Sequence, residues 1–392
     1  MGVVLPKPIL SKVIERTGNK DINSAVCSIN GFRTSMEDSH MMQLEDDRYL
    51  FGVFDGHSND KCSAFIAAHL PGRLKALQLP PAVQTLEMVC LDLDEQFFED
   101  VGEGGSTATF CIVEPVRQSA SPGAPTKNFN VTVCNVGDSR ILVIRNGALV
   151  FQTEDHKPMN PGEKARSERA GGTVRMNRVD GDLAVSRAFG DGAFKRMRED
   201  PRNQKVICVP DVSNFTCEIG DIMVVSCDGV FEGSFTNEDV AAFVTSKIPP
   251  PSNDMATIAA RVVDQAVRRG SKDNITCMIV SFTDGSTMTQ TLGAKAFVPG
   301  APFPKTHETS RSQYGKMANH AGFTVAEALE QRYQLLQHFL NGTLASQPPV
   351  MSVAFEMSDE VDIENERAAF GGGDFGPKDP SFFARMAEGA GP

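Results

Sequence analysis

The chain has 392 residues, of which 41% are hydrophobic and 22% are charged, so its size and composition exclude a single mini-domain and a wholly disordered chain. Its 38 Lys and Arg residues against 50 Asp and Glu residues give a net charge of −12. Nucleic acids and anionic membranes are bound through clustered Lys and Arg, so this excess of acids argues against both as partners. It favours bound cations instead.

The N-terminus has no apolar region typical of a signal peptide, and no apolar stretch approaches the ~18 residues of a membrane span. Gly2 follows Met1, but Pro6 stands where the N-myristoylation pattern has Ser or Thr, so that pattern is only partly met. The nine cysteines are scattered without Cys-x-x-Cys spacing, and some lie in apolar runs, which is typical of reduced thiols. We therefore expect a cytoplasmic protein, or a nuclear or membrane-associated one if Gly2 is acylated.

Short runs of β-branched and aromatic residues recur as far as about residue 282, and each is bounded by Gly, Asp, Asn or Pro. Such runs predict β-strands over residues 24–29, 48–54, 107–113, 131–136, 141–147, 148–152, 205–209, 222–227 and 274–282. Helical patterns lie between them, over residues 61–76, 83–99, 162–170 and 254–269, and one more opens at Thr236. Two of these helices follow one another and three strands come in series, an order that favours antiparallel sheets with segregated helices over a βαβ repeat.

The turn-rich stretch 119–128 predicts a hairpin loop. After about residue 285 the sequence is rich in Gly, Thr, Pro and Ser, and it predicts one more helix, over about 324–340, where Thr324 and Glu327 can form a capping box. Six acids and no base lie within residues 356–366, followed by a glycine-rich stretch, a composition that predicts a flexible acidic tail. We expect one domain over residues 1–284 and an extension over residues 285–392.

Carboxylates recur where apolar predicted strands end. Each one alone is ordinary turn chemistry, but several of them gathered at one end of a sheet would repel one another unless cations neutralise them. Oxygen-rich sites are the ones that Mg²⁺ and Mn²⁺ prefer, and Gly56 beside Asp55 would let a backbone carbonyl reach the same ion. The acids concerned are Glu37, Asp38, Asp55, Asp138, Asp228 and Asp273.

Two such ions can share a water, lower its pKa and hold it in line with a phosphorus atom, so that no protein nucleophile is needed. Arg33, four residues before Glu37, offers a fork-shaped cation for a substrate phosphate, and its alternative role is an ordinary surface ion pair. His57, two residues after Asp55, could donate a proton to a departing alkoxide. The alternative interpretation is a histidine in an ordinary turn, without a catalytic role.

Nine motifs of the chain resemble, in their order, those of the metal-dependent protein phosphatase family, type 2C. The resemblance covers roughly residues 1 to 284, which it marks as a catalytic domain. The motifs are Arg33-x-x-Met36-Glu37-Asp38, Phe54-Asp55-Gly56-His57, Gly105-Ser106-Thr107-Ala108, Asn135-Val136-Gly137-Asp138-Ser139-Arg140, Asp155-His156-Lys157-Pro158, Gly171-Gly172, Leu183-Ala184-Val185-Ser186-Arg187-Ala188-Phe189-Gly190-Asp191, Ser226-Cys227-Asp228-Gly229 and Asp273-Asn274.

The resemblance implies an α+β fold, a central sandwich of two antiparallel β-sheets flanked by α-helices, with a dinuclear Mn²⁺ or Mg²⁺ centre in a cleft at one edge. It implies hydrolysis of phosphoserine and phosphothreonine in protein substrates, without a covalent phosphoenzyme. It also implies that Arg33 binds phosphate, that His57 is the general acid, and that residues 155–194 form a flap beside the cleft. By position, the implied metal sphere is Glu37, Asp38, Asp55, Gly56, Asp228 and Asp273, some of them through water, with Asp138 and Asp228 at a weaker third site.

The chain departs from the family pattern in three places. Ser58-Asn59-Asp60 follows the Asp-Gly-His motif where a small residue and glycine are usual, and Glu232 stands where an Asp is usual. Residues 285–392 match no family pattern, so the resemblance implies nothing about them.

Three other functions are weighed against a metal-dependent phosphatase. Cys134 and Arg140 have the Cys-x₅-Arg spacing of thiolate phosphatases, but a predicted strand follows where that mechanism needs a helix N-terminus. A pseudophosphatase would have lost the metal acids, and none is lost. A metal-dependent nuclease would need a basic stripe, which the sequence lacks.

Overall fold

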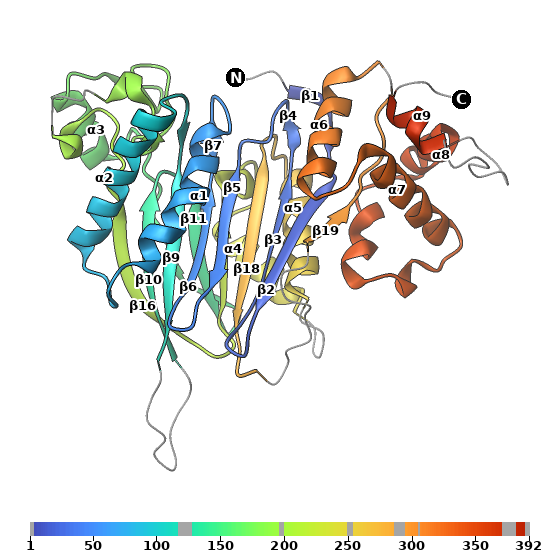
Figure 1. The fold of residues 1–392 in the computed structure, drawn as a ribbon, viewed down its shortest axis with the longest axis horizontal. Coiled ribbons are helices and arrows are strands. Elements are labelled where there is room, and N and C mark those ends of the chain that lie inside the picture. The colour runs from blue at the N-terminus through green and yellow to red at the C-terminus, as the bar shows by residue number, and fades with distance from the viewer. Residues whose placement is uncertain are drawn as a thin grey trace, which may run out of the picture.

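The computed structural model describes residues 4–116, 128–195, 200–248, 254–285, 295–304, 306–370 and 382–388. Gly2 and most of the predicted hairpin loop 119–128 lie outside the described residues. Two large antiparallel β-sheets pack face to face, and helices cover their outer faces (Figure 1). The predicted α+β class and the sandwich of two antiparallel sheets are therefore confirmed.

One sheet has five strands in the order β16-β10-β9-β6-β5, and all neighbours are antiparallel. Successive side chains of a strand point to opposite faces, so Phe51 and Val53 face the other sheet, whereas Leu50 and Phe54 face the helices. Because both faces are buried, β6 has a continuous apolar run instead of an alternating pattern. The bounds are β5 Ser39–Leu44, β6 Tyr49–Phe54, β9 Ala108–Pro115, β10 Asn128–Val136 and β16 Asp211–Glu218.

The second sheet has seven strands in the order β12-β11-β17-β18-β3-β2-β19, again antiparallel throughout. Its inner face contributes Val26, Val225 and Met278 to the core between the sheets. The bounds are β2 Lys12–Gly18, β3 Ile22–Ile29, β11 Arg140–Arg145, β12 Ala148–Gln152, β17 Ile222–Ser226, β18 Ile275–Phe282 and β19 Lys295–Val298. Since β19 pairs with β2, this sheet continues past residue 284.

Two helices cover each outer face. Helices α1 (Lys61–Lys75) and α2 (Val83–Asp100) pack on the five-stranded sheet, while α4 (Asn237–Ser246) and α5 (Met255–Arg268) pack on the seven-stranded one (Figure 1). All four agree with the helical patterns of the sequence, including the Thr236 N-cap of α4. No helix among the described residues has the length and apolarity that crossing a membrane requires.

Three shorter groups of elements lie at one end of the sandwich. Strands β7 (Gly56–His57), β8 (Gly105–Ser106) and β15 (Phe189–Gly190) form a small sheet, and β1 (Val4–Ile9) pairs with β4 (Gly31–Arg33). The predicted flap contains helix α3 (Pro161–Arg169) and the hairpin of β13 (Val174–Arg175) and β14 (Arg178–Val179). Short 3₁₀ turns complete this end: η1 Gly192–Phe194, η2 Pro201–Asn203 and η3 Asp228–Val230.

The strand predicted over residues 205–209 is wrong. These residues pack inside the flap as irregular chain, and their one ladder contact is the bridge between Ile207 and Arg187. Val206 is buried against the flap and Cys208 against the cluster under α1 and α2, which explains why the segment is apolar without being a strand. Four edge or near-edge strands, β2, β5, β16 and β19, were not predicted, because polar residues interrupt their apolar pattern.

The chain after β19 forms a helical extension that packs against β2 and β19 through a cluster containing Val13, Phe297 and Tyr314. It contains the predicted helix, α7 (Val325–Leu340), whose capping box joins Thr324 and Glu327 as expected. Helix α6, which buries Ser310, Gln313 and Gly315, lacks the apolar stripe by which a helix is recognised in sequence. The other elements are α6 Glu308–His320, η4 Leu344–Ser346, η5 Pro349–Phe355, α8 Glu360–Ala369 and α9 Phe382–Glu388.

The acidic segment 356–366 is docked on the rest of the chain, which corrects the prediction of a flexible tail for this segment. Glu356 accepts a hydrogen bond from Arg261 of α5 at 2.9 Å. Glu366 of α8 is paired with the buried Arg332 of α7 at 2.5 and 2.8 Å. The bases that neutralise these acids come from distant parts of the chain, so the local composition could not show them.

Candidate active site

Strand register brings the predicted acids to one end of the sandwich. Ser39 of β5 lies opposite Phe54 of β6, so Asp38 and Asp55 continue past the same end of that strand pair. In the other sheet, Ser226 of β17 lies opposite Cys277 of β18. Asp228, two residues beyond β17, and Asp273, two residues before β18, therefore flank the same end of this strand pair.

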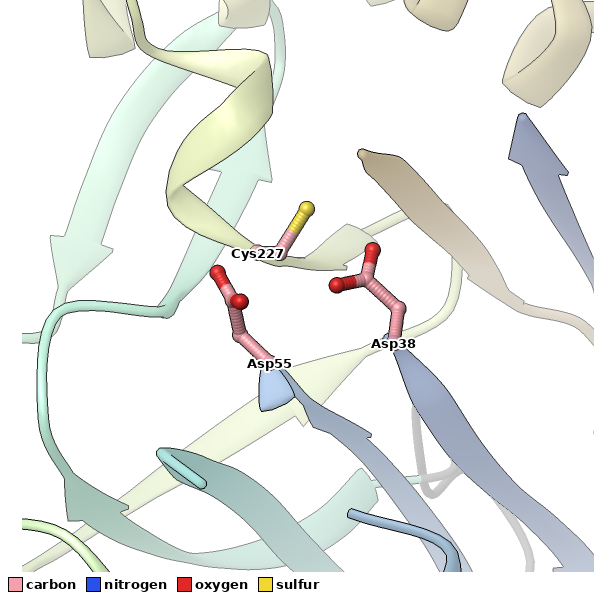
Figure 2. Close-up of side chains that lie close together, drawn as sticks. All are labelled: Asp38, Asp55 and Cys227. Atoms are coloured by element: carbon pink, nitrogen blue, oxygen red, sulfur yellow. The ribbon is translucent and has the colours of Figure 1, made fainter. Parts of the chain in front are cut away.

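Asp38, Asp55 and Cys227 lie closest together. One carboxylate oxygen of each acid and the Cys227 Sγ are all within 4.8 Å of one another. Figure 2 shows the two carboxylates projecting from the ends of separate strands into the same space, with the thiol beside them. Both carboxylate oxygens of Asp38 are shielded from solvent, and no described residue forms a hydrogen bond of ordinary geometry with them. The Thr276 hydroxyl and the Cys227 thiol lie close enough to lower the Asp38 pKa, but less than burial raises it. A buried carboxylate with so little compensation is costly, so this arrangement calls for a cation.

The electrostatics of the four strand-end acids agree with that requirement. Burial raises the pKa of Asp38 to about 7, and the negative charge of Asp273 adds to the effect. Burial also raises the pKa values of Asp55 and Asp228, and the carboxylates around them raise these values further. The side chains thus oppose one another's ionisation, and a hard divalent cation with oxygen ligands would relieve that opposition. The residues present fit Mn²⁺ or Mg²⁺.

Glu37 and Gly56 lie beside this group through their backbones. The Glu37 carbonyl accepts a hydrogen bond from the Ser63 hydroxyl at 2.5 Å, and the Glu37 carboxylate accepts one from Ser35 at 2.6 Å. A Cβ at Gly56 would lie 2.4 Å from the Glu37 carbonyl oxygen, so only glycine fits where these two segments meet. The Glu37 side chain is not part of the close group of Asp38, Asp55 and Cys227.

Two of the predicted metal acids have protein cations as partners. The Arg33 guanidinium at the end of β4 bonds the Asp273 carboxylate at 2.5 Å, and the Arg33 side chain is 43% exposed. The buried Asp138 carboxylate contacts the Lys157 ammonium. Lys157 was not predicted as a site residue, although its Asp-His-Lys-Pro motif was identified in the sequence. Its charge faces the position predicted for the weaker third metal.

His57 lies in the small sheet, where β7 and β15 flank β8. Its Nε2 is 2.8 and 2.9 Å from the two carboxylate oxygens of Asp191, the residue after β15. A Cβ at Gly105 of β8 would lie 2.2 Å from that nitrogen, so glycine is required between the pair. Burial opposes protonation of His57, but the hydrogen bond and charge of Asp191 outweigh it and raise the pKa.

Asp191 is a site residue that the sequence analysis did not identify. It ends one of the nine motifs, but 134 positions separate it from His57, and nothing local shows that the two touch. The only available signal was the positive-φ turn suggested by its Gly-Asp-Gly context, and Asp191 does adopt a φ of 57°.

The two departures near the site have structural roles. Asn59 accepts a hydrogen bond from the Lys61 backbone N–H at 2.9 Å, where α1 begins. Ser58 before it has a φ of 70°. Glu232 accepts a hydrogen bond from the Lys272 backbone N–H at 3.1 Å, so its longer side chain holds the loop that carries Asp273.

The thiolate alternative does not fit the structure. Cys134 is completely buried within β10, and burial raises the pKa of its thiol. Arg140 is bonded to Asp155 at 2.8 Å. Cys227 is also buried, and burial together with the charges of Asp38 and Asp55 raises its thiol pKa. Neither cysteine is therefore a thiolate nucleophile.

Comparison with known proteins gives a consistent result. The family model described as "Protein phosphatase 2C" matches residues 22–275. The rat "Protein phosphatase 1B" is 31% identical over 312 residues, covering 72% of this chain and 76% of that protein. The mouse "Probable protein phosphatase 1N" is 32% identical over 352 residues, covering 86% of this chain and 76% of that protein. That second match must run beyond residue 284, into the extension.

A solved structure is also similar. The crystal structure of a phosphatase from a pathogenic strain of Toxoplasma gondii has a TM-score of 0.64 and 30% sequence identity. The similarity covers 73% of this chain and 98% of that one. It therefore spans nearly the whole of that phosphatase, whereas part of the present chain lies outside it.

Proposed function

The chain belongs to the protein phosphatase 2C family, and we propose that it hydrolyses phosphoserine and phosphothreonine in proteins at a dinuclear Mn²⁺ or Mg²⁺ centre. The observation that carries the proposal is the pair of Asp38 and Asp55, whose carboxylates lie close together at the end of the sandwich. Among the described residues, Asp38 has no hydrogen bond of ordinary geometry. We assign catalysis to residues 1–284.

The ions would be held by the strand-end acids and one backbone carbonyl. We propose Asp38, Asp55, Asp228 and Asp273 as the main carboxylates, and Asp138 as part of a weaker third site. Bound ions of this kind supply a Lewis acid and a water of lowered pKa at neutral pH. The Glu37 carboxylate and the Gly56 carbonyl complete the proposed sphere, some members of it acting through water.

Arg33 is the proposed phosphate-binding group. Its side chain is 43% exposed at the edge of the acid cluster, where a substrate can reach it. A guanidinium can bond two phosphate oxygens at once, so it fixes the orientation of the phosphoryl group as well as its position. Its bond to Asp273 holds the guanidinium beside the acids and limits its movement.

His57 is the proposed general acid. A departing serine or threonine alkoxide needs a proton, and an imidazolium can supply it. The Nε2 of His57 is committed to Asp191, so the proton must come from Nδ1. Asp191 thereby fixes the ring orientation and stabilises its charged form. It is a positioning residue, because it acts through His57.

Turnover of two substrates tests the proposal. The purified chain should hydrolyse p-nitrophenyl phosphate and a phosphothreonine peptide with Mn²⁺ or Mg²⁺, lose this activity in EDTA, and keep it after thiol alkylation. Binding of the phosphopeptide without turnover would identify a pseudophosphatase instead. Activity that survives EDTA but not alkylation would identify a thiolate enzyme, and cleavage of DNA or RNA would identify a nuclease.

A further inference from the structure

A cavity of about 430 Å³ lies between the N-terminal strand and the C-terminal extension. One wall is β1, with Val4, Leu5 and Pro6, and the opposite wall is residues 306–310, where α6 begins. Thr34 also lines the cavity. Figure 1 shows α6 beside β1, between the sandwich and the helices α7, α8 and α9 of the extension. The cavity is therefore formed jointly by the first and the last parts of the chain.

The cavity adjoins the proposed phosphate-binding arginine. Thr34 is the residue directly after Arg33, and Val4 pairs with Arg33 in the β1–β4 ladder. Paired residues of an antiparallel ladder have Cα atoms about 4.5–5.5 Å apart. Two residues that line the cavity are thus immediate neighbours of Arg33, one along the chain and one across the strands.

The loop between Arg33 and the metal acids also contacts the extension. Met36 packs against the hydrophobic cluster that contains Tyr314 and Met317 of α6. Since Met36 is two residues from Asp38, the extension supports the same loop that carries Arg33, Glu37 and Asp38. The cavity is consequently part of the surface around the active site.

The lining has an apolar side and a polar side. Leu5 is 5% exposed and forms the apolar side together with Val4 and Pro6, which are exposed. The polar side consists of Thr34, Thr306, His307, Glu308, Thr309 and Ser310. No Lys or Arg lines the cavity among the described residues, and Glu308 would repel a second phosphate or an acidic side chain. The apolar side of such a mixed cavity suits an aliphatic group.

We propose that this cavity binds an aliphatic side chain of the phosphoprotein substrate, close in sequence to the phosphorylated residue. The proposal rests on the proposed function of Arg33, because the phosphate held there sets where the flanking residues lie. An extended peptide advances about 3.3 Å per residue, so the side chain involved lies within one to three residues of the phosphorylated one. The C-terminal extension thus contributes directly to substrate selection.

Phosphopeptide kinetics test this inference. A phosphothreonine peptide set places Leu, Ala, Asp or Lys at each of the three positions on either side, and kcat/KM is compared with that for p-nitrophenyl phosphate. The wild-type chain should prefer Leu over Ala at one position by about tenfold or more, the discrimination that an apolar pocket gives. Thr309→Phe fills the cavity from α6 and should reduce that preference to less than about twofold. Gln334→Phe, which adds the same group to an exposed position of α7, should keep it.

Thr306→Phe fills the cavity from the residues before α6 and gives a second test if Thr309→Phe does not fold. The inference is overturned if the wild-type chain shows no aliphatic preference, or if both filled variants keep it. A preference for Lys would also overturn it, because it would mean that Glu308 selects a cation. No metal-dependent hydrolysis of p-nitrophenyl phosphate would instead refute the proposed function, so the two failures are distinguishable.

Discussion

Asp38 at the active-site end and Glu366 in the C-terminal extension are both shielded from solvent, yet their surroundings are opposite. The Glu366 carboxylate accepts hydrogen bonds from Arg332 at 2.5 and 2.8 Å, and both side chains are almost completely buried. The Arg332 guanidinium also donates to the carbonyls of Pro299 and Ala354 and stacks on Phe355. The carboxylate oxygens of Asp38 have no hydrogen bond of ordinary geometry with any described residue, and only the Thr276 hydroxyl and the Cys227 thiol partly offset their burial.

A buried charge that is paired within the chain has a structural role, whereas a buried charge without such a partner indicates a binding site. In the extension the chain supplies both charges, so the pair is complete on folding and joins α7 to α8. At the active-site end burial and neighbouring negative charges raise the pKa values of Asp38 and Asp55, and no described Lys or Arg forms an ion pair with either acid. The charge that compensates these two acids therefore has to come from outside. The central claim of this account is that the external charge is a divalent cation.

The largest effect is expected from Asp55→Asn. Removing a proposed ligand should lower kcat/KM on p-nitrophenyl phosphate by at least about a thousandfold, within the range that metal catalysis supplies. The melting temperature in EDTA should stay the same or rise, because the substitution also removes a repulsive charge. Asp46→Asn, at an exposed acid, is the matched control. A variant that kept its rate would remove Asp55 from the proposed sphere.

Asp191 sharpens the comparison, because it is a buried acid at the active-site end with an internal partner. His57→Gln should slow hydrolysis of a phosphoserine peptide by about 10²–10⁴-fold, the usual contribution of a general acid. The loss on p-nitrophenyl phosphate should be smaller, because nitrophenolate needs little protonation. Asp191→Asn should show the same substrate dependence with a smaller loss. Equal losses on both substrates would refute the acid role of His57.

How far the sequence predicts the site depends on whether the signal is local. The acids of the candidate site were predictable because Asp55 and Asp228 directly follow apolar runs. The order of the motifs then indicated the protein family. The contact of His57 with Asp191 and the pairing of Arg332 with Glu366 were not predictable, because each joins segments far apart in the chain. Helix α6 was missed for a different reason: its buried face contains Ser310 and Gly315, so it shows no apolar stripe.

Glu366→Gln should lower the free energy of unfolding through its effect on the extension. Breaking one partner of a buried ion pair costs about 3–5 kcal/mol, because the Arg332 charge would remain buried without its counter-charge. Urea denaturation of the full chain measures this loss. Arg332→Leu together with Glu366→Ala should recover part of it by removing both charges. An unchanged denaturation midpoint for Glu366→Gln would show that the pair is not a structural requirement.

The smallest effect is expected at the surface of the same extension. Lys7 contacts Asp362 at 3.3 Å, but their side chains are 66% and 41% exposed. Exposed pairs contribute about 0.2–1 kcal/mol, so Lys7→Ala should hardly change the urea midpoint. A loss of stability as large as that of Glu366→Gln would show that burial does not determine how much each ion pair contributes to stability.

Thermal unfolding of metal-free protein with and without added Mn²⁺ shows whether a divalent cation binds these acids. A ligand present at 100 times its dissociation constant stabilises a folded protein by about 2.7 kcal/mol, so Mn²⁺ should raise the melting temperature of the wild-type chain. The same rise is expected for Glu366→Gln, from a lower starting temperature, and none for a chain with both Asp38→Asn and Asp55→Asn. An equal rise in that double variant, or no rise in the wild-type chain, would contradict the account.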